Sequence, residues 1–215
     1  MHGCTLIKNL RGMAFALLVL GAWLGTGQAA RATAVIPPDF ATLVADAQLI
    51  FRGEVTATRS EWTGTGSTRA IMTFVTFKVL ETIKGSAKEP YVLQMLGGTV
   101  NGHTLKVTGV PTFKVGDRTL LFVENNGTQF FPVVGIMNGY FKLVKDTATG
   151  DEIVFRHDGT KLKSVTQIDQ THNEAMNPAL GLSSTSKVSA ASSVDTSLKA
   201  SEFETAIRKQ LIAPK

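Results

Sequence analysis

Residues 69–81, RAIMTFVTFKVLE, decide the fold that the sequence predicts. β-branched and aromatic side chains fill this stretch, and such residues are typical of extended strands. Alternation places apolar residues on both faces over part of its length, which indicates a strand covered on both sides. We therefore expect residues 69–81 to form a central strand of a β-sheet.

The flanking sequence extends this pattern. From residue 49 to 58 polar and apolar residues alternate with a period of two, and Gly53 marks a bulge or bend. Residues 59–68, RSEWTGTGST, read as a loop between the two strands. Further strands are predicted at 91–96, 103–107, 119–123, 130–134, 140–145 and 152–155. Short strands joined by glycine-rich turns predict an all-β protein, an antiparallel barrel or sandwich.

The β-domain is expected to span residues 31–156 and to begin with a short helix. Pro37 and Pro38 precede Asp39, which can accept hydrogen bonds from the first amides of a helix. Apolar residues then recur at helical spacing over 40–47. This helix is expected to cover one end of the sheet.

The composition changes after the last predicted strand. Residues 157–200 are rich in Ser, Thr, Asn, Ala and Lys, and they read as a flexible tether. Residues 201–213 then predict a helix, with Ser201 as its cap and Glu204 completing a capping box. Two readings of this helix stay open: it docks on the domain, or it binds a partner.

The first 30 residues have the order of a secretory signal peptide. Lys8 and Arg11 precede a short apolar run at 13–24, and small residues follow at 25–32. The apolar run is too short for a membrane span. An exported protein, periplasmic or extracellular and with no membrane span in the mature chain, is therefore expected.

Composition narrows the class of partner. Cys4 is the single cysteine and lies in the predicted signal peptide, so a mature chain would have neither disulfides nor thiolate ligands. Removing residues 1–30 leaves 20 basic and 17 acidic residues, a charge of +3. This weak, scattered excess argues against nucleic acid as a partner.

Four segments carry a resemblance to a known group of proteins. They are DAQLIFRGEVTA, MTFVTFKVLETIKGS, LQMLGGTVNGHTLKVTGVPTFKVGDRTLLFV and FFPVVGIMNGYFKLVKD, within residues 46–146. This succession resembles uncharacterised exported bacterial proteins whose core is similar to the OB-like barrel of the netrin and tissue-inhibitor-of-metalloproteinase superfamily. The resemblance implies an OB-like barrel and a secreted metallopeptidase as one possible partner. The zinc-chelating N-terminal cysteine of the animal inhibitors has no counterpart here.

The glycine-rich stretch 96–111, LGGTVNGHTLKVTGVP, could be a phosphate loop, a metal site or a turn. It lacks the Gly-Lys-Ser/Thr of a phosphate loop and opens no helix. His103 has no histidine at metal-ligand spacing, since His157 and His172 lie far along the chain. A turn between antiparallel strands is the favoured interpretation, with no metal and no cofactor.

Trp62 stands out among the loop residues, because a tryptophan in a Gly/Thr-rich segment either covers the end of a barrel or anchors a partner. OB-like barrels bind ligands through loops and one sheet face. The candidate binding residues are Trp62, Gly98, Asn101, His103 and Asn138.

No catalytic motif is recognised, so the predicted function is a non-enzymatic binding module for a protein or an envelope polymer. One alternative is an inhibitor or partner of a secreted metallopeptidase. Another is an envelope-polymer hydrolase, which would need Glu54, Asp117 and His103 gathered in one cleft.

Overall fold

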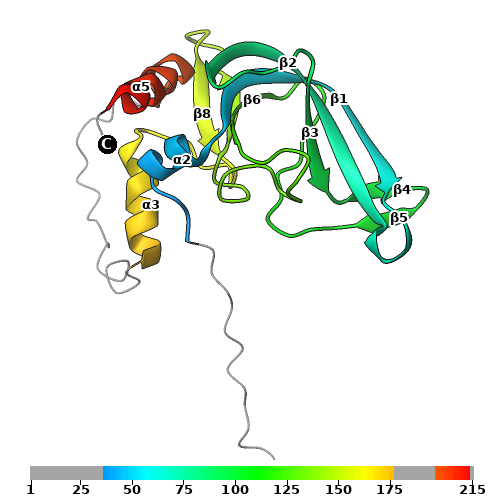
Figure 1. Ribbon diagram of the computed structural model, residues 1–215. Helices are drawn as coiled ribbons and strands as arrows, with labels where there is room; N and C mark the ends of the chain where they lie inside the picture. The colour runs from blue at the N-terminus through cyan, green and yellow to red at the C-terminus, as the bar shows by residue number, and fades with distance from the viewer. Residues whose placement is uncertain (1–35, 177–196, 214–215) are drawn as a thin grey trace, which may run out of the picture. The chain divides into compact units, whose positions relative to one another are not determined.

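The computed structural model describes residues 36–176 and 197–213, and the predicted signal peptide lies outside them. The helices are α2 (Phe40–Asp46), η1 (Gly66–Thr68, a 3₁₀ turn), α3 (Thr166–Met176) and α5 (Ala200–Ile212). The strands are β1 (Leu49–Thr63), β2 (Ala70–Lys84), β3 (Tyr91–Leu96), β4 (Gly98–Val100), β5 (His103–Leu105), β6 (Arg118–Val123), β7 (Tyr140–Lys145) and β8 (Glu152–Arg156). The fold is thus mostly β, as predicted (Figure 1).

Six strands form one antiparallel sheet in the order β3-β2-β1-β6-β7-β8, and β4 and β5 form a separate hairpin. The predicted central strand, β2, lies between β3 and β1. The order is open, with β3 and β8 at its edges among the described strands, so the predicted closed barrel is not confirmed.

Instead of a strand, a loop lies along the edge of β3. The Gln94 amide donates to Oδ1 of Asn126 at 3.0 Å, and Nδ2 of Asn126 donates to the carbonyl of Val92 at 2.8 Å. The predicted strand at 130–134 is wrong, because this segment makes one isolated bridge, Val133 to Val123. Pro132 has no N–H to donate to a ladder, which limits pairing there.

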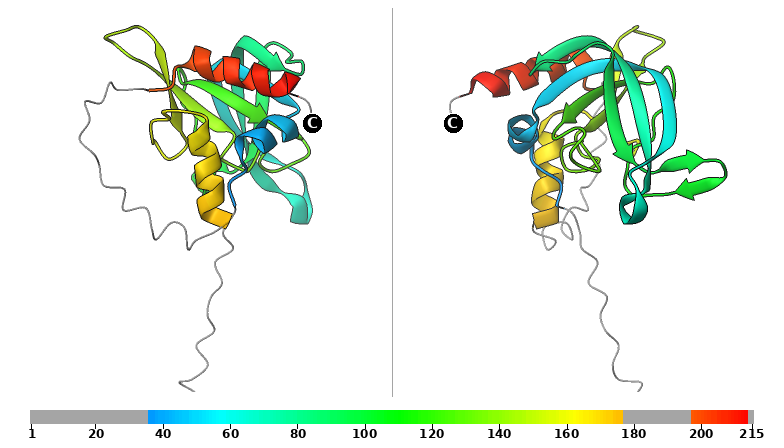
Figure 2. Two further views of the ribbon diagram at one scale, coloured as in Figure 1. Left: turned by 90° about the vertical axis from the view of Figure 1, so that its left-hand side faces the viewer. Right: turned by 45° about the vertical axis from the view of Figure 1, so that its right-hand side comes forward.

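The long β1–β2 hairpin is strongly curved, as Figure 2 shows. Its register shifts at three places, including the predicted irregularity between Arg52 and Gly53. A further shift leaves Thr56 of β1 without an opposite residue, and its hydroxyl donates to the carbonyl of Thr76 at 3.2 Å. Bulges of this kind bend a strand and increase its twist.

The strand β1 runs five residues beyond its predicted end, so the first half of the predicted loop 59–68 is strand. Cross-strand stacking favours this extension. The guanidinium of Arg59 lies 4.3 Å from the ring centroid of its partner Phe74.

Apolar residues cover both faces of the sheet and form two cores. The inner core fills the concave side of the curled sheet, where Phe51 contacts Phe77 and Tyr91 edge-on or tilted, with ring centroids 5.5 and 5.0 Å apart. The outer core lies between the other face and the three helices, and Phe203 of α5 reaches Phe122 and Phe141 there. The burial of both faces explains why the strands are not simply amphipathic.

The terminal helices differ from prediction in one important respect. Residues 157–176, expected to belong to a tether, include α3, and the Phe40 amide donates to Oδ1 of Asp169 on that helix at 2.9 Å. The remaining stretch of the predicted tether at 177–196 lies outside the described residues. No helix in the described ranges is long and apolar enough to cross a bilayer.

The helix α5 begins one residue earlier than predicted, and its cap is different. Glu202, rather than Glu204, reaches back to the amide that precedes the helix, that of Lys199, at 3.1 Å. Glu204 instead faces the sheet, where its Oε1 lies 2.7 Å from Nε of Arg52. The predicted Ser201–Glu204 capping box is therefore wrong, because Glu204 has a stronger partner on the sheet.

Asp39 caps α2 as predicted, and this contact should respond to pH. Its Oδ1 accepts a hydrogen bond from the Thr42 amide at 2.7 Å, and this bond lowers the pKa of Asp39. We expect Asp39→Ala to lower the free energy of unfolding by about 1 kcal/mol at pH 7. Because the folded-state pKa is depressed, the wild-type advantage is complete above the ordinary value of 3.8 and disappears as pH falls through the lower folded pKa.

Urea unfolding of the wild type and the variant at pH 7 and below pH 3 measures this difference. Asp39→Asn is the matched control, since its side-chain oxygen also caps but does not titrate. Equal stability of wild type and Asp39→Ala at pH 7 would show that the cap contributes nothing.

Candidate functional site

The β4–β5 hairpin contacts the far part of β1 and β2 and projects from that end of the fold (Figure 2). Asn101 and Gly102 connect its strands, and their φ angles of +49° and +79° fit a primed two-residue turn. The predicted antiparallel turn is confirmed here. Asn101 contributes mainly its backbone conformation, since Asn adopts positive φ more readily than most residues.

Glycine is required where this hairpin touches the sheet. A Cβ on Gly98 would lie 2.4 Å from both Oγ of Ser60 and Oγ1 of Thr73. The Gly98 φ of +131° is also a conformation that other residues rarely adopt. Gly98 thus serves a close backbone approach rather than binding a phosphate.

The Thr73 hydroxyl fastens the start of the hairpin to the sheet, and the Ser60 hydroxyl in turn contacts Thr73. Oγ1 of Thr73 donates to the carbonyl of Gly97 at 2.6 Å, so the contact between Ser60 and Thr73 at 2.8 Å uses Ser60 as its donor. The hairpin itself carries a second hydroxyl pair, Thr99 with Thr104 at 2.9 Å.

Trp62 lies at the far end of β1, opposite Ile71, and not in a loop as predicted. The guanidinium of Arg69 lies 4.4 Å from its ring centroid, and the His103 ring is 6.0 Å away, edge-on. The tryptophan stays 37% exposed. We call Trp62, Arg69 and His103 the aromatic end.

Four of the five predicted binding residues therefore meet at this end of the fold: Trp62, Gly98, Asn101 and His103. Asn138 does not belong with them. Its Nδ2 donates to the carbonyl of Gly135 at 3.0 Å and stabilises the turn that precedes β7. A side chain that bonds its own turn is explained by local structure.

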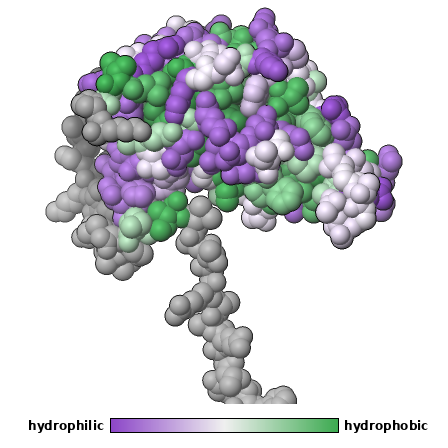
Figure 3. Space-filling model, viewed as in Figure 1, coloured by the Kyte–Doolittle hydropathy of each residue, from purple (hydrophilic) through white to green (hydrophobic). Residues whose placement is uncertain are grey.

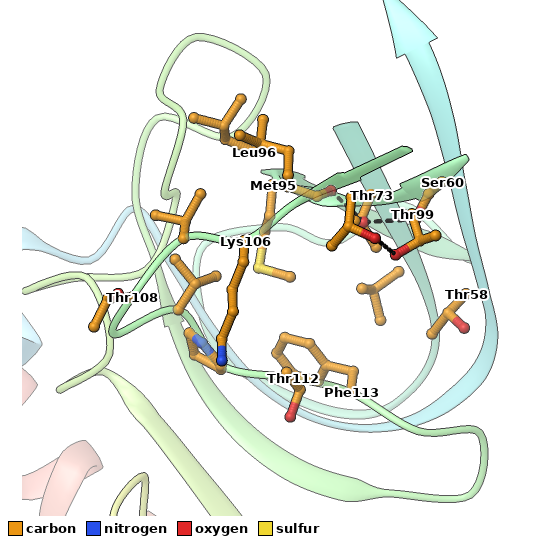
Figure 4. Close-up of a pocket in the computed structure, with 18 of the residues that line it drawn as sticks. Thr58, Ser60, Thr73, Met95, Leu96, Thr99, Lys106, Thr108, Thr112 and Phe113 are labelled. Carbon is orange, nitrogen blue, oxygen red and sulfur yellow. Dashed lines mark hydrogen bonds between the residues drawn. The ribbon is translucent and has the colours of Figure 1, made fainter. Parts of the chain in front are cut away.

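A cavity of about 560 Å³ lies beside the aromatic end, between the sheet, the β4–β5 hairpin and residues 106–113. In Figure 4 the side chains of Ser60, Thr73 and Thr99 lie together on one side of the cavity, while Thr112 lies beside Phe113. The apolar lining consists of Val75, Met95, Val110 and Phe113. The size falls within the range of small-molecule sites. The sequence interpretation did not identify this cavity, and of its lining residues it had named only Gly98 as a candidate.

The bulge at Thr56 explains why the cavity was missed. Strict alternation from residue 49 places Thr58 on the face opposite Val55. Because Thr56 is an extra residue, Thr58 pairs with Val75 and Val55 with Phe77, and both point to the inner face. Ser60 and Trp62 follow Thr58 onto that face. The alternating hydroxyl residues Thr58 and Ser60 were the signal in the sequence that could have indicated a polar wall on this face.

The three titratable residues suggested for an enzyme are not gathered in one cleft, because His103 lies apart from the other two. Glu54 and Asp117 are neighbours, since the Val55 amide donates to the Asp117 carbonyl at 2.9 Å. Glu54 pairs with Arg118 in the register of β1 and β6, and the carboxylate of Asp117 contacts Lys142 at 3.1 Å. His103 lies beside Trp62, and Trp62 is eight residues further along β1 than Glu54. In the described residues no group of three or more His, Cys, Asp or Glu side chains is placed to hold a metal ion.

A buried tyrosine, Tyr140, lies next to Phe113 of the cavity lining. Burial, together with the charge of Asp117, raises the pKa of Tyr140 to about 12. Phe113 stacks edge-on against this tyrosine with ring centroids 5.2 Å apart. Tyr140 therefore keeps its proton beyond the pH at which an ordinary tyrosine, with a pKa of 10.0, loses it.

No family model matches this chain, and no curated protein matches it in sequence. The resemblance to the netrin and tissue-inhibitor-of-metalloproteinase superfamily therefore stays a prediction. Function has to be argued from the geometry of the described residues.

Proposed function

We propose that this chain is an exported, non-enzymatic binding module, with an OB-like curled sheet as scaffold, that recognises a protein or an envelope polymer through the aromatic end. The observation that carries the proposal is Trp62, which is 37% exposed and contacts both Arg69 and His103. Tryptophan and arginine are the residues most enriched among binding hot spots.

The surroundings support this assignment. The residues at this end, mostly Thr, Ser and Gly, are small, and Figure 3 shows a largely pale surface there, the colour of intermediate hydropathy. Such a surface exposes one large aromatic ring without an extended apolar patch. Rigid strands hold Trp62 at the cross-strand position of buried Ile71, so little ordering entropy is lost on binding.

The test is affinity purification from the native envelope fraction with the tagged chain, followed by binding measurements on the purified partner. We expect Trp62→Ala to weaken binding by tenfold or more, as for a hot-spot tryptophan. Ile212→Ala is the matched control, because Ile212 is 83% exposed but lies at the end of α5. Equal loss in both variants, or unchanged affinity in Trp62→Ala, would contradict the proposal.

A further inference from the structure

The cavity is closed at its base by an aromatic plug. Phe113 contacts Phe77 and Tyr140 edge-on, with ring centroids 5.5 and 5.2 Å away. The cavity therefore borders the inner core, and Phe113 together with the core residues Val75 and Met95 forms its apolar floor. An apolar group of a ligand would be buried against this floor.

The polar wall of the cavity retains hydrogen-bonding capacity. In the Thr99–Thr104 pair one hydroxyl donates to the other, so the accepting residue has an O–H to donate elsewhere. Thr58, Thr108 and Thr112 add further hydroxyls around the cavity. This wall suits a ligand that carries oxygen acceptors.

The charged side chains that line the cavity are all positive. Arg59 and Lys106 line the cavity, and no Asp or Glu is among the described lining residues. Arg59 is already engaged, since its guanidinium pairs with Glu61 and stacks on Phe74. Lys106 is exposed, and no carboxylate of a described residue lies within ion-pair distance of its amine. In Figure 4 its side chain extends along the cavity toward the segment of Thr112.

We propose that this cavity binds a small amphipathic carboxylate, with the Lys106 amine pairing with the carboxylate and the apolar body resting on Val75, Met95 and Phe113. A cation without a carboxylate partner next to an apolar floor favours an anion that carries an apolar group over a neutral or cationic molecule. The site is separate from the aromatic end, because Trp62 is not among the lining residues. The inference therefore goes beyond the proposed function.

Calorimetric titration of the full chain with octanoate tests this proposal, with octanamide as the uncharged ligand of the same shape. We expect octanoate to bind, octanamide to bind about tenfold more weakly, and Lys106→Met to abolish this preference. Lys106→Arg, which keeps the charge, should retain it. Lys114→Met removes a lysine on the adjoining turn outside the cavity and should change nothing.

The location of binding is checked by methyl NMR. Signals from Val75, Met95 and Val110 should shift on addition of octanoate, while Leu162 in the outer core stays unchanged. A tetrapeptide that ends in leucine, with a free or an amidated C-terminus, tests whether the natural carboxylate belongs to a peptide. Binding of the free form but not of the amidated form would indicate a peptide C-terminus, and binding of octanoate alone would indicate a free acid. Absence of octanoate binding, equal affinity for octanamide, or unchanged binding by Lys106→Met would overturn the proposal.

Discussion

Replacing Phe203 by alanine is expected to lower the free energy of unfolding by about 3–5 kcal/mol, the range for a large aromatic residue removed from a packed core. Phe203 is fully buried, and its ring lies 5.9, 6.1 and 4.9 Å from those of Phe40, Phe122 and Phe141. These partners belong to α2, β6 and β7, so one side chain joins α5 to three other elements. Its loss leaves a cavity at their junction.

Leu211→Ala is the matched control on the same helix. Leu211 follows Phe203 at helical spacing but is 37% exposed, so its truncation should cost less than about 1 kcal/mol. Urea unfolding followed by circular dichroism measures both variants. A Phe203→Ala cost no larger than that of Leu211→Ala would mean that α5 does not belong to the cooperative core.

This pair of variants also separates the two readings of the terminal helix. The sequence predicted an apolar stripe of Phe203, Ile207 and Leu211 without deciding between docking and partner binding. In the structure Phe203 and Ile207 are buried against the domain. The contact of Glu204 with Arg52 could not be predicted, since these residues are joined only by the tertiary fold.

Strands with strong local signals could be predicted closely. Residues 91–96 and 140–145 form β3 and β7 with the predicted ends, because turn residues and changes of periodicity mark both boundaries. The failures have non-local causes. α3 buries one residue, Ile168, and is held by contacts such as that of Asp169 with the Phe40 amide, so its own composition gave little helical signal.

In the candidate site, too, local features could be predicted from the sequence and tertiary contacts could not. The glycine turn and its position were predictable from residue type, because positive φ angles favour Asn and Gly. The grouping of Trp62 with His103 was not, since it depends on the β4–β5 hairpin meeting the far end of β1 in the tertiary fold. The bulge at Thr56 reversed the face predicted for Thr58, and Ser60 and Trp62, predicted to lie in a loop, follow it on the inner face. Period-two reasoning does not detect such a bulge.

Replacing Arg52 by methionine is expected to lower the free energy of unfolding by about 2 kcal/mol. This lies between the ~0–1 kcal/mol of exposed ion pairs and the ~3–5 kcal/mol lost when one partner of a buried pair is removed. The Arg52 side chain is 22% exposed and contacts two carboxylates that are each 14% exposed, Glu204 at 2.7 Å and Glu152 at 3.4 Å. Glu152 keeps Arg118 at 3.0 Å, whereas Glu204 is left facing the sheet without its cation.

Arg208→Met is the matched control, because Arg208 on the same helix pairs with Glu81 but is 49% exposed. Its loss should cost less than about 1 kcal/mol. Combining Arg52→Met with Glu204→Met removes the uncompensated carboxylate, so the double variant should be more stable than the sum of the single effects predicts. Urea unfolding of the wild type, Arg52→Met, Glu204→Met and the double variant measures this double-mutant cycle. Additive effects, or equal losses from Arg52→Met and Arg208→Met, would show that the ion pair between β1 and α5 does not help to fix the helix on the sheet.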